Sequence, residues 1–325
     1  MSNKLIDVHS HPLLPTWLEA LGRATGKTSE ALTISGAPVP PWSTERHLDA
    51  MDGHGISASI LSLPDATDFL KGREARALAR TINEQLAEIV ARHPSRFGAF
   101  AVVPLDDMDA AIEEMTYALD VLRLDGVASS THADGVYLGD SYFDRWFEEM
   151  NRRSVTLFVH PVPPPHFELG RIGLNVAILE FMFDSTRMVA NMVMSGAKAR
   201  FRDVAIISTH GGGAIPYLAS RISVLEPLFG AGENRQTLSG EEVLTGLSSF
   251  YYDLTASTAP ASIDAIRRLV PASQILTGFD FPMMPASTIA SAQEQFATYE
   301  GMQRDEKRMI LAGNALRLFP RLACQ

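Results

Sequence analysis

The stretch Ile6-Asp7-Val8-His9-Ser10-His11-Pro12 closes an apolar run near the N-terminus with two histidines spaced two residues apart. Because side chains alternate sides along a β-strand, a strand here presents His9 and His11 on the same face. Two imidazoles held parallel by one strand form a chelating pair for a divalent metal. Such pairs also occur on solvated strands, so the meaning of this one depends on what the other strands carry.

The rest of the chain alternates short β-rich runs with long helical patterns, and eight such repeats can be counted. Several of the β-rich runs are almost continuously apolar, which is typical of parallel strands covered on both faces. We expect strands over Leu5–His9, Ile56–Leu63, Arg96–Val103, Gly126–Ser130, Thr156–His160, Val204–His210, Phe250–Thr255 and Gln274–Asp280.

Amphipathic helical patterns lie between these runs and after the last one. They cover Glu74–Arg92, Met108–Leu122, Phe143–Arg153, Leu174–Ser195, Ala214–Leu228, Ser262–Leu269, Ser287–Tyr299 and Asp305–Leu316, with Asp305 as the expected N-cap of the last helix. The pattern predicts a single (β/α)8 barrel domain, an α/β TIM barrel, over residues 1–325. The alternative is a doubly wound open sheet, but no glycine-rich phosphate loop follows the first strand.

A barrel of this kind carries its chemistry at the C-terminal ends of the strands. His9 and His11 end the first expected strand, and His160, His210 and Asp280 end the fifth, sixth and eighth. We predict that His9, His11, His160 and Asp280 bind one divalent metal and leave a position open for water or substrate, as catalytic sites do. Zn²⁺ suits this set of ligands best, while Mn²⁺ and Fe²⁺ remain open.

His210 lies in the segment Ser208-Thr209-His210-Gly211-Gly212-Gly213. The glycines interrupt the strand and allow backbone or substrate to approach closely. A histidine beside a metal can act as a proton shuttle or general base. The alternatives are a further metal ligand and a residue whose hydrogen bonds are purely structural.

Two long segments are expected as loops over the catalytic face, where they would form a lid or shape the pocket. They are Pro12–Trp42 and the proline-rich Pro161–Gly173. Ordinary surface loops are the alternative interpretation. An apolar rim of the pocket is expected from Trp42, Phe281, Met283 and Met284, although Met and Phe are more often core residues.

The chain has 28 basic and 38 acidic residues, a formal net charge of −10. This charge argues against nucleic acid or an anionic membrane as the main partner, because neither would be attracted. The one cysteine, Cys324, permits no intramolecular disulfide. Apolar runs such as Ala99–Val103 are too short to span a bilayer, and no leader segment is evident. We therefore expect a cytoplasmic protein.

Taken in order, these motifs resemble the amidohydrolase superfamily, and within it the aminocarboxymuconate-semialdehyde decarboxylase-like branch. The matching segments are Asp7-Val8-His9-Ser10-His11, Phe158-Val159-His160-Pro161, Ser208–Gly213, Gly278-Phe279-Asp280-Phe281-Pro282 and Gly313-Asn314-Ala315. The resemblance implies the same four metal ligands, with His210 as the acid–base histidine. The fourth expected strand, Gly126–Ser130, has no lysine for carbamylation, which favours one metal over two. Members of the branch are mostly non-oxidative decarboxylases without an organic cofactor, with some hydrolases among them.

The resemblance also implies substrate-binding residues and a homodimer. Arg221 matches an arginine that reaches the neighbouring subunit's active site to hold a substrate carboxylate, although a helical arginine is usually a solvated surface residue. A second such arginine is replaced here by His47, counted back from Met51-Asp52. This departure favours members similar to 6-methylsalicylate decarboxylase, which act on a small monocarboxylic hydroxybenzoate. We expect His47, Trp42 and Phe281 to contact the substrate.

The predicted reaction is protonation of the ring carbon that bears the carboxylate, followed by loss of CO2. Asp280 or His210 delivers the proton, and the sequence does not choose between them. A metal-dependent hydrolase of a lactone, ester or amide would use the same residues. A metal-stabilised binding protein without activity is the third possibility.

Overall fold

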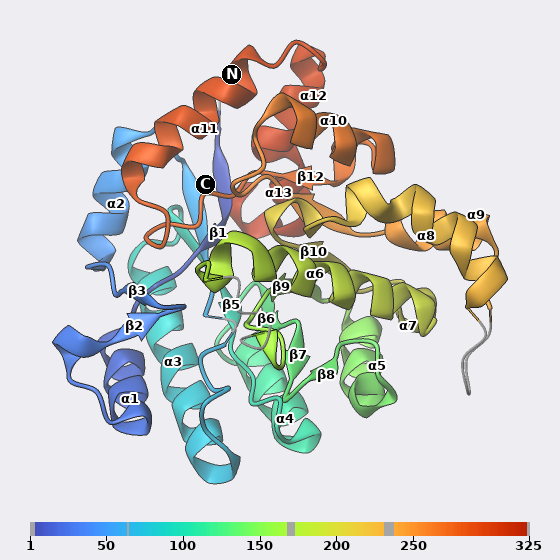
Figure 1. Cartoon of the computed structure of the whole chain (residues 1–325). Helices are drawn as coiled ribbons and strands as arrows, with labels where there is room; N and C mark the ends of the chain where they lie inside the picture. Colours follow the sequence, from blue (N-terminus) through green and yellow to red (C-terminus); the bar gives the residue numbers. More distant parts are fainter. Residues whose placement is uncertain (1–3, 64, 168–172, 231–236, 324–325) are drawn as a thin grey trace.

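The computed structural model describes residues 4–63, 65–167, 173–230 and 237–323 (Figure 1). At its centre is an eight-stranded sheet in which every neighbouring pair of strands is parallel. In sheet order the strands are β1 (Ile6–Ser10), β4 (Ala58–Leu61), β5 (Phe97–Ala101), β6 (Gly126–Ser130), β9 (Thr156–His160), β10 (Ala205–Ser208), β11 (Tyr251–Asp253) and β12 (Ile275–Leu276).

The segment that follows the last strand returns to the first one. The backbone N–H of Val8 donates to the carbonyl of Thr277 at 2.9 Å, and the N–H of Asp280 donates to the carbonyl of His9 at 2.8 Å. These bonds join the two edges of the sheet, so the sheet closes on itself. The predicted (β/α)8 barrel is confirmed, and the same bonds hold Asp280 next to the His9 backbone.

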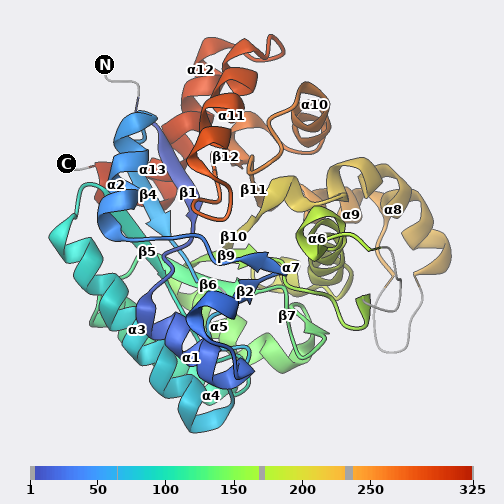
Figure 2. The same ribbon diagram turned by 60° about the vertical axis from the view of Figure 1, so that its left-hand side comes forward.

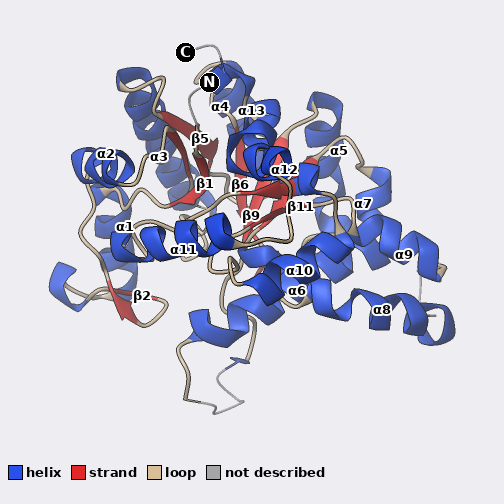
Figure 3. Ribbon diagram, turned by 90° about the horizontal axis from the view of Figure 1, so that it is seen from above, coloured by secondary structure: helices blue, strands red, loops and turns tan. Residues whose placement is uncertain are grey.

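Helices surround the barrel (Figure 3). They are α2 (Thr44–Gly53), α3 (Gly72–Arg92), α4 (Met108–Asp120), α5 (Asp144–Arg153), α6 (Val176–Met194), α7 (Ala197–Arg200), α8 (Ile215–Phe229), α9 (Gly240–Leu247), α10 (Pro260–Leu269), α11 (Ala286–Thr298), α12 (Arg304–Arg308) and α13 (Asn314–Leu318). Seven of the predicted helices agree with α3, α4, α5, α6, α8, α10 and α11 to within a few residues, whereas α7 and α9 were not predicted. Within the described ranges, no helix combines the length and the apolar character needed to cross a membrane.

The prediction of Asp305 as a helix N-cap is wrong. Gln303 caps α12, and the side chain of Glu306 accepts a hydrogen bond from the backbone N–H of Gln303 at 2.8 Å. Because of this reciprocal arrangement the helix begins earlier in the chain than expected, at Arg304, and Asp305 lies in its first turn. The expected long helix is also interrupted, because Met309–Gly313 forms a π-helical turn before α13 begins.

The segment Pro12–Trp42, expected as a loop, carries secondary structure of its own (dark blue in Figure 2). It contains α1 (Pro15–Thr25) and a short hairpin of β2 (Thr33–Ile34) and β3 (Ala37–Pro38). Pro15 occupies the first helical turn, where its missing N–H costs nothing, and Trp17 is buried. The second expected loop is described only in part, since residues 168–172 lie outside the described ranges, as does Cys324.

The barrel interior is filled by apolar side chains, and the last helix closes one end. Ile6, Ile60, Phe100 and Phe158 from the strands form one buried cluster with Phe319, which follows α13. Phe319 packs edge-on against Phe100, with ring centroids 5.6 Å apart. At the other end of this cluster Phe158 meets the ring of a histidine, His9, at 5.0 Å. The apolar core of the barrel therefore lies directly beneath the polar site and contacts it through Phe158 and His9.

Candidate metal centre

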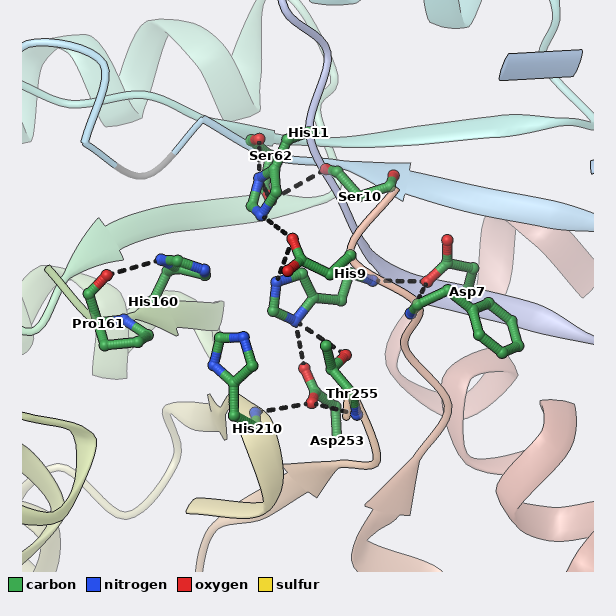
Figure 4. A network of polar contacts seen from close by, with 12 residues as sticks. Asp7, His9, Ser10, His11, Ser62, His160, Pro161, His210, Asp253 and Thr255 are labelled. Carbon is green, nitrogen blue, oxygen red and sulfur yellow. Dashed lines mark hydrogen bonds and ion pairs between the residues drawn. The ribbon is translucent and has the colours of Figure 1, made fainter. Parts of the chain in front are cut away.

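Four side chains converge at the C-terminal end of the barrel (Figure 4). His9 lies on β1 and His11 directly follows that strand; His160 ends β9, and Asp280 lies in the segment after β12. One potential ligand atom from each of the four lies within 4.8 Å of all the others. The structure thus brings together the four residues that the sequence predicted as metal ligands.

Each of the three imidazoles is held by a hydrogen bond from its Nδ1. The acceptors are Asp253 Oδ2 for His9 (2.8 Å), the Ser62 carbonyl for His11 (2.9 Å) and the Pro161 carbonyl for His160 (2.8 Å). Because a carbonyl or a carboxylate oxygen only accepts, Nδ1 carries the proton and Nε2 keeps its lone pair. Metal-binding histidines are oriented by bonds of this kind.

The buried atoms at the centre fit a divalent cation. Nε2 of His9, Nε2 of His11 and Oδ1 of Asp280 are buried without a hydrogen-bond partner. Lone pairs on neutral imidazoles and a carboxylate cannot satisfy one another, and each unsatisfied buried group costs about 1–3 kcal/mol. Asp280 Oδ1 lies 3.0 Å from Nε2 of His11 and 3.5 Å from Nε2 of His9. One cation bound between these atoms would remove the mismatch, so the cluster forms a single divalent metal site.

Asp253, at the end of β11, was missed by the sequence analysis. It is fully buried, and its Oδ1 accepts from the backbone N–H groups of His210 (2.9 Å) and Thr255 (3.0 Å) while Oδ2 holds His9. Burial acts to raise the pKa of Asp253, but the charge and hydrogen bond of His9 outweigh it, so this pKa is lowered. Its one available signal was an acidic residue near the end of the seventh expected strand.

Asp7 supports the site from the other side. Its carboxylate accepts from the backbone N–H groups of His9 (3.0 Å) and Phe279 (3.1 Å) and from the Ser59 hydroxyl (3.1 Å). Burial raises the pKa of Asp7 to about 7. Asp7 therefore ties the strand that carries His9 to the segment that carries Asp280.

His210 lies beside the cluster but not on a strand, because β10 ends at Ser208 and His210 begins a 3₁₀ turn. Its ring centroid is 4.9 Å from that of His9 and 5.1 Å from that of His160. Burial and the neighbouring His9 lower the pKa of His210 to about 4, so the imidazole is neutral near pH 7. Its Nδ1 is buried without a partner.

Strained backbone accompanies the two acid–base candidates. His210 and Asp280 have φ angles of +52° and +60°, a region that residues other than glycine seldom adopt. Gly212 lets the turn at His210 approach β11, since a Cβ there would lie 2.3 Å from the ring of Tyr252. The side chains of both candidates are thus positioned by unusual local backbone conformations.

A cavity of about 510 Å³ opens above the cluster and is lined by His11, His160, His210 and Asp280. Most of its wall is apolar and includes Leu13, Trp17, Leu63, Phe181, Met283 and Met284. The segment Pro12–Trp42 contributes Leu13, Trp17, Ile34, Ser35 and Ala37 to the wall. In the described part of the chain no lysine or arginine lines this cavity.

The other predicted substrate-binding residues lie elsewhere. His47 is buried in α2, accepts a hydrogen bond from Nε1 of Trp42 (3.2 Å) and packs on Phe281 at 5.0 Å between ring centroids. None of these three side chains lines the cavity. Arg221 is exposed on α8 and does not line it either. The contacts of these residues with a substrate stay predictions.

Comparison with known proteins agrees with this geometry. A family model described as amidohydrolase matches residues 6–321. A 6-methylsalicylic acid decarboxylase of Penicillium expansum is 32% identical over 328 residues, covering 98% of this chain and 96% of the relative. The decarboxylase yanB of Aspergillus niger is 34% identical, covering 97% and 87%.

Among solved structures, a 5-carboxyvanillate decarboxylase from Novosphingobium aromaticivorans has the same fold, with a TM-score of 0.84 and 18% identity. The match covers 98% of this chain and 96% of that one, and the structure was solved with manganese and a nitrobenzoic acid. The chain belongs to the amidohydrolase family, and within it to the branch of metal-dependent decarboxylases.

Proposed function

We propose that this chain is a non-oxidative decarboxylase of a small hydroxybenzoate with one carboxylate, releasing CO2 and a phenol. The observation that carries the proposal is a three-imidazole, one-carboxylate centre at the floor of a largely apolar cavity. Such a cavity suits an aromatic ring whose carboxylate is held at the metal. The similarity to a 6-methylsalicylic acid decarboxylase supports the same class of substrate.

We assign His9, His11, His160 and Asp280 as the ligands of one divalent ion. Zinc is the proposed metal, because three imidazoles and a carboxylate are typical zinc ligands. Manganese is the alternative, and it is the metal found in the related 5-carboxyvanillate decarboxylase structure. Metal analysis of the purified protein, followed by reconstitution with each ion, decides between them.

A divalent cation held by these four residues would supply the positive charge that orients the acid. Asp280 or His210, once it has taken up a proton from water, donates this proton to the ring carbon that bears the carboxylate. The bond from this carbon to the carboxylate breaks, its electron pair restores aromaticity, and CO2 leaves. The donor regains its proton from water. The apolar walls position the ring and exclude bulk solvent.

A homodimer is proposed from the exposed surface of α8. Tyr217, Val224 and Leu228 are 85%, 60% and 69% exposed. With Arg221 they fall at positions i, i+4, i+7 and i+11, so all four lie on one face of the helix. A large apolar face on one side of a soluble helix favours burial against another chain. We propose that a second copy covers this face and that Arg221 enters the partner's site. A cytoplasmic location stays a prediction.

The product assay tests the proposed activity. Metal-loaded protein is incubated with 6-methylsalicylate, salicylate and dihydroxybenzoates, and CO2 and phenols are measured. We expect CO2 with the matching phenol, and loss of both in His9→Ala. If no acid in the set yields CO2 while lactones or esters are hydrolysed, the hydrolase alternative replaces the proposal.

A further inference from the structure

Among the described residues, one carboxylate besides Asp280 lines the cavity above the metal centre. This is Asp65, which lies in the loop after β4 and is half-buried. Together with Val162 and Pro163, Asp65 also lines a neighbouring cavity of about 390 Å³. These three residues therefore form the wall that the two cavities share.

Apart from a bound metal ion, no cationic group faces Asp65 in the active-site cavity, because its described lining residues include neither lysine nor arginine. Lys71 lines the neighbouring cavity, but its Nζ lies 2.6 Å from Asp134 and is committed to that carboxylate. Burial raises the pKa of Asp65, and the imidazole of His11 acts in the opposite direction. The carboxylate of Asp65 can accept hydrogen bonds from a ligand in a cavity whose wall is otherwise mostly apolar.

The charges in the site permit one anionic group on the substrate. The two positive charges of a divalent cation would be balanced by the carboxylates of Asp280 and Asp65, so one substrate carboxylate held at the metal already leaves a net negative charge. A second carboxylate on the ring would meet Asp65, and the described residues of the wall offer it no lysine or arginine. Two carboxylates a few ångströms apart in a partly desolvated site repel each other, and this repulsion lowers the affinity for the second acid roughly tenfold or more.

We infer that Asp65 determines substrate specificity by excluding aromatic acids with a second carboxylate and by offering an acceptor to a ring hydroxyl. The inference rests on the proposed function, whose substrate class it narrows. A neutral hydroxyl donates to this carboxylate, whereas a second carboxylate has nothing to donate and is repelled. Asp65 takes no part in the bond-breaking step.

The experiment compares salicylate with the four salicylates that carry a second carboxylate at ring position 3, 4, 5 or 6. For wild type, Asp65→Asn and Asp65→Ser, kcat/KM for CO2 release is measured, and dissociation constants are measured by calorimetry. We expect both variants to shift the preference toward at least one dicarboxylate by about tenfold or more. Metal content and circular dichroism should equal those of wild type.

Asp68→Asn is the matched control, because it removes a carboxylate three residues away. Asp68 is exposed, accepts a hydrogen bond from the Ser130 hydroxyl and lines only the neighbouring cavity. This control should leave the preference for salicylate within about twofold of wild type, since its charge is outside the active-site cavity.

The outcomes separate this inference from the proposed activity. An unchanged preference in both Asp65 variants overturns the inference, and so does an equal shift in Asp68→Asn, because net charge would then be the cause. If no acid releases CO2 but the calorimetric preference shifts only in the Asp65 variants, the specificity role stands and decarboxylation fails. If none of the acids binds the metal-loaded protein, both are overturned.

Discussion

Asp253 and His9, 244 positions apart in the chain, are joined by a buried hydrogen bond of 2.8 Å between Oδ2 and Nδ1. The other oxygen of Asp253 accepts from the backbone of His210. One carboxylate therefore orients a proposed metal ligand and positions the proposed acid–base histidine beside it. Through this link, the strand β11 contributes to the site although none of its side chains is a proposed ligand.

Asp253→Asn should weaken metal binding by about 10–100-fold, because the charge that orients His9 and favours its protonated Nδ1 is lost. Equilibrium competition with a chromophoric chelator measures this affinity. Asp120→Asn, which removes an exposed carboxylate on α4, should leave it unchanged. A metal affinity equal to wild type in Asp253→Asn would show that the bond does not support the site.

Asp280→Asn should abolish turnover while leaving the fold intact, since Asp280 is both a proposed ligand and a candidate proton donor. The expected loss in kcat is at least about 10²–10⁴-fold. Circular dichroism checks the fold, and CO2 release checks the activity. His210→Asn, measured beside it, assigns the proton: a loss of similar size with the metal retained points to His210. Retention of most activity in Asp280→Asn would refute its role.

The positions of the proposed metal ligands were predictable because each follows or ends a recognisable strand, and a barrel brings those strand ends together. Asp253 escaped prediction because the seventh strand was expected to run to Thr255, which placed Asp253 inside it. The structure ends β11 at Asp253 itself. Asp65 was missed for a different reason: it lies in a loop, and only the tertiary structure shows which loop residues reach the cavity.

Secondary structure within Pro12–Trp42 was not predicted because the prolines and glycines of this segment suggested a loop. In the structure Pro15 begins a helix and Gly26, at φ +66°, ends it. Proline and glycine thus mark the two ends of a helix here and do not exclude one. The burial of Trp17 against the barrel, which stabilises α1, is a tertiary contact that local sequence does not show.

His47→Gln should make the protein less sensitive to acid. Burial, with Arg96 and His11 nearby, lowers the pKa of His47 to about 3 from its ordinary value of 6.5. Between about pH 3 and pH 6.5, His47 is therefore protonated in the unfolded chain but neutral in the folded chain. The free energy of unfolding should fall by about 3 kcal/mol as the pH falls from 7 to 4.

Urea unfolding of chelated protein at pH 7 and pH 4 measures this dependence. Gln removes the titrating group but can still accept the hydrogen bond from Trp42, so its pH dependence should be flatter than that of wild type. Parallel pH dependences in the two proteins would contradict the assignment.

Mixing two inactive variants tests the shared site. His9→Ala lacks a proposed metal ligand, and Arg221→Ala lacks the arginine proposed to serve the partner. A mixed dimer contains one site with both residues intact, so random exchange should restore about a quarter of the wild-type activity. As a control, mixing two preparations of His9→Ala should restore no activity. Failure of exchanged mixtures to recover activity, or a monomer in solution, would reject the shared site.

Decarboxylation in ²H₂O tests directly whether the protein replaces the carboxylate of a hydroxybenzoate by a proton from solvent. Protein loaded with one metal per chain is given 6-methylsalicylate, and the CO2 and the position of deuterium in the phenol are measured. The account predicts equimolar CO2 and phenol, with one deuterium on the carbon that lost the carboxylate, and none of this in His9→Ala. A phenol formed without deuterium at that carbon, or no CO2 from any hydroxybenzoate despite bound metal, would contradict it.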